Sequence, residues 1–292
     1  MVHTLVITGA SGFLGHTLTE VARDSWPEAT LLPLNSPRHG GIDLAKPSAS
    51  GDLEAAIQLT NPREAILIHA AALVKWSSVD GLMANVAMAV NVATWARAMD
   101  IGFSVLVSGV NVYPDVPFAN IYTPCCPTSF YGIGKVVAEH LWRLLIPEER
   151  SAIVRLAGIW GWQPRPTLFW NTLLLAAARG FTGDSRPIVR RKRSRRNYIS
   201  AREASECLLQ VASNRMAGMF LAAGKDVVDT ETFINALETS PDSRLSVDWQ
   251  DDGGEDEKIY EPSIELLSWL KPFPEELPAI WKSKPDWVMR PS

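Results

Sequence analysis

Short apolar runs alternate with amphipathic stretches along the first half of the chain. Five runs have the length and composition of buried strands: 2–8, 29–34, 64–69, 103–107 and 152–155. Stretches with apolar residues at helical spacing follow most of them, at 13–22, 53–59, 79–99 and 136–145. Strands that alternate with helices predict a parallel sheet with right-handed crossovers. The pattern therefore predicts a doubly wound α/β fold.

The second half of the chain is less regular. Helical patterns at 168–179 and 204–212, an apolar strand at 218–224 and a helix start at Asp229 are the clearest elements. We expect the acidic, glycine-containing stretch 251–257 to be a loop, and the Pro/Trp-rich tail after Leu270 to pack along the outside. The chain then divides into a sheet-forming core, 1–165, and a mixed segment, 166–292, that contributes a small second lobe and the tail.

Composition narrows the class of protein. The 292 residues are 47% hydrophobic and 21% charged, as in ordinary globular proteins, and the net charge of −4 argues against nucleic acid as a partner. No apolar run approaches the roughly 20 residues that span a bilayer, and the first residues lack a basic leader, so we expect a cytoplasmic protein. Three cysteines make no disulfide framework, and no Cys/His cluster has metal-ligand spacing.

Three glycines follow the first predicted strand at regular spacing, Gly9, Gly12 and Gly15. A strand, a glycine turn and a helix together present a helix N-terminus to a phosphate group. Gly9 would allow a tight exit from the strand, Gly12 the close approach of a pyrophosphate, and Gly15 the packing of helix against strand. The turn predicts a dinucleotide site in the core.

This Thr-Gly-x-x-Gly-x-x-Gly pattern resembles the short-chain dehydrogenase/reductase superfamily. Phe13-Leu14-Gly15 resembles its extended branch of sugar-nucleotide epimerases, dehydratases and reductases, and the resemblance covers about residues 4–240. It implies a Rossmann fold with a substrate lobe at the C-terminal edge of the sheet. It also implies that the cofactor lies on the glycine turn, against Gly9, Ser11, Gly12, Phe13, Leu14 and Gly15.

The end of the second strand indicates which nicotinamide cofactor is used. An acidic residue there binds the ribose hydroxyls of NAD, whereas an arginine accommodates the 2′-phosphate of NADP. The strand runs into Asn35-Ser36-Pro37-Arg38-His39, which favours NADP over NAD unless Arg38 is only a solvated turn residue. The resemblance implies that Asp43 and Leu44 are an adenine-binding pair. It also implies that the small residues Ala70, Ala71 and Ala72, after the strand that ends at His69, let the cofactor approach closely. Two further matches to the family are Asn85 and Asn91, in the predicted helix 79–99. We expect His69 to be structural.

Tyr131 and Lys135 are four residues apart at the start of a helix, so both side chains share one face. A phenol ordinarily ionises near pH 10, and a nearby lysine together with an oxidised nicotinamide ring would stabilise the phenolate. Such a tyrosine can exchange a proton with an alcohol or carbonyl oxygen. The pair predicts a catalytic role, with Lys135 also holding the cofactor ribose.

The hydroxyl that normally completes this site is missing at its usual position. In the extended branch a Ser or Thr stands four residues before the Tyr of a Val-Tyr element, and here that position is Gly109. Ser108, one residue earlier, is one candidate replacement and Asn111 is a second. Dehydratases carry Asp-Glu at the next two positions, where this chain has Val110-Asn111, so dehydration is not expected.

Substrate contacts are less clearly marked. Lys75 follows the alanines, Trp160 stands at the tyrosine of an Arg-Pro-x-x-x-Tyr-Gly element, and Arg196 matches an Arg-Asp-Phe element of the family. The run 190–196 carries six basic residues. It predicts either a clamp for an anionic group on the substrate or a solvated hairpin or oligomer contact.

The sequence thus predicts an NAD(P)-dependent oxidoreductase, with NADP favoured, that interconverts a secondary alcohol and a ketone of a small-molecule substrate. An NAD-dependent sugar-nucleotide epimerase and a cofactor-binding sensor or scaffold without catalysis are the alternatives. The resemblance implies a homodimer through helices near 80–99 and 131–146. No metal, membrane or nucleic acid is expected as a partner.

Overall fold

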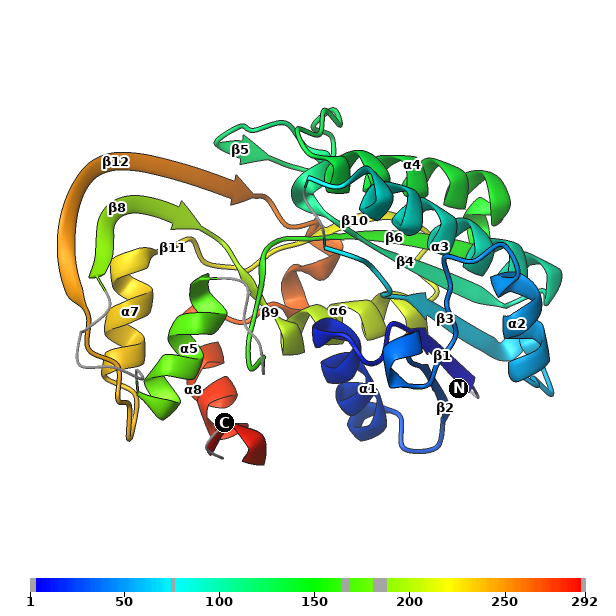
Figure 1. Cartoon of the computed structure of the whole chain (residues 1–292), viewed down its shortest axis with the longest axis horizontal. Helices are drawn as coiled ribbons and strands as arrows, with labels where there is room; N and C mark the ends of the chain where they lie inside the picture. Colours follow the sequence, from blue (N-terminus) through cyan, green and yellow to red (C-terminus); the bar gives the residue numbers. More distant parts are fainter. Residues whose placement is uncertain (1–3, 75–76, 164–168, 181–187, 290–292) are drawn as a thin grey trace.

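A computed structural model describes residues 4–74, 77–163, 169–180 and 188–289. Its main sheet has six parallel strands in the order β10-β6-β4-β3-β1-β2 (Figure 1). These strands are β1 Thr4–Thr8, β2 Thr30–Leu34, β3 Ala65–His69, β4 Phe103–Gly109, β6 Ser151–Leu156 and β10 Gly218–Ala222. The predicted doubly wound α/β fold is confirmed.

Helices cover both faces of this sheet. One face packs against α1 Phe13–Ser25 and α6 Ala201–Ser213, and the other against α2 Ala49–Ala56, α3 Val79–Ala98 and α4 Phe130–Leu145. Strands β3, β4 and β6 are buried along their whole length, which explains why most of their residues are apolar. Strand β2 lies at the edge, where its Pro33 is tolerated.

A second lobe, at the left of Figure 1, has its own sheet and core. Its four-stranded sheet has the order β11-β8-β12-β5, and a separate two-stranded pair, β7-β9, contacts α6. The strands are β5 Phe118–Ala119, β7 Ile159–Trp160, β8 Ile188–Arg196, β9 Ile199–Ser200, β11 Val228–Asp229 and β12 Asp248–Tyr260. The helices are α5 Phe169–Arg179, α7 Thr230–Glu238 and α8 Phe273–Lys282.

The division of the chain is less simple than a single boundary. The segment 166–292 forms most of the second lobe, to which β5 and β7 come from earlier in the chain. The same segment also returns α6 and β10 to the main sheet, where β10 pairs with β6. Asn197 joins the two units: its buried amide donates to the carbonyls of Gly224 and Tyr260 and accepts from the Tyr260 N–H.

Two expectations for the second half are wrong. The acidic stretch 251–257 is not a loop but part of β12, and its backbone pairs in parallel with the basic strand β8. Opposite charge stands across this ladder, as at Arg195 and Glu257, whose side chains lie 2.6 Å apart. The tail is not an outer covering either, because α8 contributes Leu277 and Trp281 to the core of the lobe.

Among the residues described, none of the helices combines the length and apolar character that a membrane span requires.

Candidate functional site

The glycine turn is packed against its neighbours through backbone atoms. Gly9 has φ +75°, in the left-handed region, and a Cβ on it would lie 2.6 Å from the Ala71 Cα. A Cβ on Gly15 would overlap the Gly9 carbonyl oxygen. A Cβ on Gly12 would meet only the Gly9 oxygen, at 3.1 Å. The fold itself requires glycine at 9 and 15, whereas the space before Gly12 is left for a ligand.

The start of α1 offers free backbone donors to that space. Gly12 is the N-cap residue, its backbone is extended, and no side chain caps the helix. The first turn carries no acidic residue. The backbone N–H groups of a first helical turn and the positive end of the helix dipole together favour binding of a phosphate group. The turn therefore fits the diphosphate of a dinucleotide.

Two asparagines of α3 fix the loops beside the turn. Asn85 is buried, and its amide both accepts from the Leu73 N–H and donates to the Leu73 carbonyl. Asn91 donates to the carbonyls of Leu44 and Lys46. The loop after β3, with Ala70, Ala71 and Ala72, and the Asp43–Leu44 segment are thereby held at the carboxyl edge of the sheet.

The segment that follows β2 contacts the glycine turn directly. The Ser11 hydroxyl accepts from the Ser36 N–H at 3.1 Å and lies 3.3 Å from the Ser36 hydroxyl, which contacts His39 Nδ1 at 3.0 Å. Arg38 is exposed in the same 3₁₀ turn, 37–39. Ser36 and His39 were not singled out from the sequence, although their position beside Arg38 was the available signal.

Tyr131 and Lys135 lie side by side in the first turns of α4. The helix begins at Phe130 because the Ser129 hydroxyl caps it by accepting from the Gly132 N–H. Both side chains are buried, and Lys135 Nζ lies 5.6 Å from the centre of the Tyr131 ring. Lys135 Nζ donates to the Val107 carbonyl near the end of β4. The pair therefore faces the same sheet edge as the glycine turn.

His69, at the end of β3, is a buried neutral residue. Its Nδ1 lies 2.7 Å from the Thr8 hydroxyl, and its ring stacks on Trp142. Burial, and then the charge of Lys135, lower the pKa of His69 to about 3. The imidazole stays uncharged at neutral pH and serves to join β1, β3 and α4.

Ser108 points into a buried polar network instead of an open space. Its hydroxyl donates to Glu139 Oε1 at 2.5 Å, one helical turn beyond Lys135. Glu139 also forms a buried ion pair with Arg155, whose guanidinium donates to the Tyr113 hydroxyl. Burial alone would lower the pKa of Arg155, but the hydrogen bonds and charge of Glu139 outweigh it and raise the pKa. The network ties β4 to α4 and β6.

The Asn111 side chain lies directly beside the position that a side chain at Gly109 would take. A Cβ on Gly109 would lie 3.3 Å from Asn111 Oδ1. A Cβ on Gly132 would overlap the Asn111 carbonyl oxygen, so α4 starts directly against the 3₁₀ turn 110–112. Asn111 thus lies between the end of β4 and the beginning of the helix that carries Tyr131.

The predicted substrate residues are dispersed. The Trp160 indole is buried against Phe233 and Phe273 in the core of the second lobe. Arg196, at the end of β8, is half-buried near Asp115 and Tyr260. Lys75 lies outside the described residues. The basic run is strand β8, whose partner strand β12 carries the acidic run.

A parallel doubly wound sheet whose first strand runs through a glycine turn into a helix has the architecture of the dinucleotide-binding Rossmann folds. The sequence matches the model of the NAD-dependent epimerase/dehydratase family over residues 5–220. The chain belongs to this family, which confirms the resemblance to the extended short-chain dehydrogenases/reductases.

Solved structures show the same fold at low identity. The dTDP-4-dehydrorhamnose reductase of Bacillus anthracis, in complex with NADP, is 18% identical with a TM-score of 0.76, over 97% of this chain and 100% of that one. MoeE5 with UDP-glucose and NAD is 18% identical (TM-score 0.73; 96% and 97% covered). The Thermus thermophilus UDP-glucose 4-epimerase with NAD is 16% identical (TM-score 0.75; 96% and 98%). No curated protein matches the sequence significantly.

We expect Gly15→Ala to destabilise the protein by about 1–3 kcal/mol, because its methyl group overlaps the Gly9 carbonyl oxygen. Gly51→Ala is the matched control, since Gly51 is exposed in α2 and has open space around it. The control should gain about 0.5–1 kcal/mol from helix propensity. Urea unfolding measures both, and equal midpoints for the two variants would contradict the packing of the turn.

Proposed function

We propose that the protein is an NAD(P)-dependent oxidoreductase, with NADP preferred, that interconverts a secondary alcohol and a ketone. The observation that supports this most directly is the Tyr131/Lys135 pair. Both side chains are buried on one face of α4, at the sheet edge that also carries the glycine turn. A nicotinamide cofactor, when bound, supplies or accepts the hydride.

In this proposal Tyr131 moves the proton. During reduction its hydroxyl donates a proton to the carbonyl oxygen of the substrate, and during oxidation the phenolate takes the proton back from the alcohol. Lys135 is held near the tyrosine by its hydrogen bond to the Val107 carbonyl. Its positive charge favours the phenolate and can also contact the ribose hydroxyls of the cofactor.

Asn111 is the group that we propose binds the substrate oxygen. Its amide lies beside Gly109, where relatives place a hydroxyl, and next to the start of α4. Ser108 is less suited to this role, because its hydroxyl is already donated to Glu139. An amide N–H can donate to an oxygen that gains negative charge in the transition state. With Val110-Asn111 in place of two carboxylates, water elimination is not proposed.

The preference for NADP rests on the segment after β2. Arg38 is exposed beside Ser36 and His39, and Ser11 links this turn to the glycine turn. A 2′-phosphate bound there would receive a charge-assisted hydrogen bond from the guanidinium. Asp43, Leu44 and the three alanines 70–72 would border the adenosine.

The substrate is proposed to be a small molecule, and nucleotide-linked sugars are the first class to test because the names of several structural neighbours carry them. The basic strand β8 gives little support for an anion clamp, since β12 places acidic residues opposite it. Arg196 is the basic residue retained as a substrate contact. Lys75 and Trp160 remain predictions from the sequence.

A homodimer and a cytoplasmic location also remain predictions. The outer faces of α3 and α4 expose apolar side chains at Val79, Met83, Ile133 and Val137. We propose this face as the contact between two copies of the chain.

Replacing Tyr131 by Phe removes the proton donor, and we expect kcat to fall about 10²–10⁴-fold. NADPH oxidation with 4-keto nucleotide sugars and simple ketones measures the change. Tyr122→Phe, an 88% exposed tyrosine, is the control and should keep full activity. Unchanged turnover in the Tyr131 variant would refute the mechanism. NADPH binding without turnover of any substrate by the unmodified protein would favour the sensor alternative.

Replacing Asn111 by Ala should lower kcat about 10²–10³-fold if the amide stabilises the substrate oxygen. Ser108→Ala should change kcat far less. The double variant Gly109→Ser/Asn111→Ala places a hydroxyl in the vacated space and should recover part of the activity. Full activity of Asn111→Ala, or loss confined to Ser108→Ala, would move the oxygen-binding role to Ser108.

Removing the Arg38 guanidinium should weaken NADPH binding about tenfold or more and leave NADH binding unchanged, because only NADPH carries the 2′-phosphate. Fluorescence titration of nucleotide-free protein measures both affinities. Arg23→Ala, at the exposed far end of α1, is the control. Mass spectrometry of the denatured protein comes first, since stoichiometric retained NAD would favour the epimerase alternative.

A further inference from the structure

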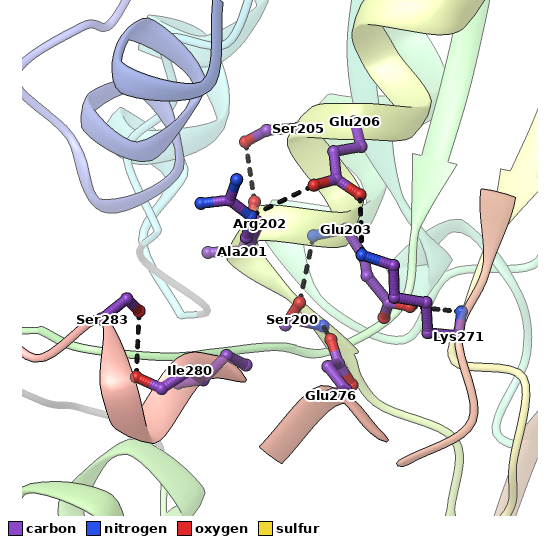
Figure 2. A network of polar contacts seen from close by, with 10 residues as sticks. All are labelled: Ser200, Ala201, Arg202, Glu203, Ser205, Glu206, Lys271, Glu276, Ile280 and Ser283. Atoms are coloured by element: carbon purple, nitrogen blue, oxygen red, sulfur yellow. Dashed lines mark hydrogen bonds and ion pairs between the residues drawn. The ribbon is translucent and has the colours of Figure 1, made fainter. Parts of the chain in front are cut away.

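The start of α6 and the segment 271–276 at the start of α8 exchange hydrogen bonds. Ser200 is the N-cap of α6, and its hydroxyl accepts from the Glu203 N–H. In an ordinary capping box the glutamate would accept from the N–H of the capping serine. Here the Ser200 N–H donates to Glu276 of α8, at 3.0 Å, while Glu203 Oε1 accepts from the Lys271 N–H just before α8, at 2.6 Å (Figure 2).

The exchange leaves two carboxyl groups buried together. Glu203 is 2% exposed and Glu276 is 5% exposed. Glu203 Oε2 is buried, and no N–H or hydroxyl of the described residues donates to it. Both residues meet at Ser200, whose N–H donates to the Glu276 carboxyl group and whose hydroxyl accepts from the Glu203 N–H. A proton held between the two groups would supply the missing donor, whereas two ionised carboxylates would repel each other in this buried site.

The surrounding charges do not offset a second negative charge. Among the described residues, no Lys, Arg or His forms an ion pair with either carboxyl group. Lys271 and Arg202 both pair with Glu206, on the next turn of α6. From the side of α8, Asp226 accepts from the Phe273 N–H, which adds another carboxylate to the junction. Burial of the Glu203 and Glu276 carboxyl groups together is therefore favourable only while one of them is protonated.

We propose that Glu203 and Glu276 share one proton, and that this pair latches the C-terminal helix α8 onto the start of α6 in a pH-dependent way. The latch positions part of the site. Residues of α6 (Ala201 and Arg202), Ile280 of α8 and Ser283, which follows α8, form one wall of a cavity of about 720 Å³, and the cavity extends to Gly12 and Phe13 of the glycine turn. Release of α8 removes that wall. The latch does not rest on the proposed oxidoreductase activity.

The direction of the pH dependence follows from Glu276. Burial, and then the hydrogen bond and charge of Glu203, raise the pKa of Glu276 from 4.5 to about 10. The folded protein thus keeps a proton that the unfolded chain releases above about pH 4.5. The stabilisation is complete below that pH and declines as the pH rises toward 10.

Glu276→Gln tests the latch, because its amide can accept from Ser200 and donate to Glu203 without a titrating proton. Unfolding by urea between pH 5.5 and 9.5 should show a steady loss of stability for the unmodified protein. Glu276→Gln should lose less stability over this range. The ratio of its folding equilibrium constant to that of the unmodified protein should therefore grow about tenfold or more from pH 6 to 9. Glu275→Gln, an exposed neighbour on α8, is the control and should parallel the unmodified protein.

Hydrogen exchange locates the effect. After correction for intrinsic rates, the amides of α8 should lose protection at pH 9 relative to pH 6 in the unmodified protein and keep it in Glu276→Gln, while α3 stays unchanged. If Glu276→Gln fails to fold, Glu203→Gln removes the paired charge and should flatten the profile in the same way. Profiles parallel to the unmodified protein in the folded variant would overturn the proposal.

Discussion

The contact between the Gly9 turn and the loop after β3 is the constraint on which the site depends. The Gly9 and Ala71 backbones approach so closely that no side chain fits between them, and Gly15 brings α1 against the same turn. Asn85 then fixes the far end of the loop at Leu73. Because these segments touch through main-chain atoms, they form a rigid surface whose donors are arranged before any ligand arrives, which lowers the entropic cost of binding.

One face of helix α4 makes the polar contacts at the carboxyl edge of the main sheet. Tyr131, Lys135 and Glu139 occupy successive turns, and each has a different environment. Lys135 reaches a β4 carbonyl, whereas Glu139 accepts from Ser108 and pairs with Arg155. A buried ion pair contributes little net stability when its charges are merely close, but here hydrogen bonds satisfy both partners and fix three segments of backbone. Polar contacts thus hold this edge of the sheet in place, and apolar packing holds the rest of the sheet.

The features that the sequence predicted are those encoded by local spacing. The β1 strand, its glycine turn and α1 depend on neighbouring residues, and Tyr131 and Lys135 meet because they are four apart on a helix. The orientation of the Ser108 side chain was not predictable in this way. It depends on the extension of β4 to Gly109 and on the packing of α4 beside that strand.

Elements that depend on distant partners were missed or misread. The strands β8 and β12 are far apart in sequence, and their runs of like charge resemble solvated loops until each is placed opposite the other. The helix α8 contains Pro278 and follows Pro272, so its composition resembled an irregular tail, although it buries Trp281. Glu203 and Glu276 are charged residues that a sequence places on the surface, and only the packing of two helices brings them together.

The late return of β10 to the main sheet has a consequence for dissecting the protein. Strand β6 is buried along its whole length, and β10 is its outer neighbour. A fragment that stops near residue 165 would leave the β6 backbone as an open sheet edge with unpaired N–H and C=O groups. Such an edge is a template for pairing with other chains. The edge of the core sheet next to β6 is thus completed by a strand that is synthesised after part of the second lobe.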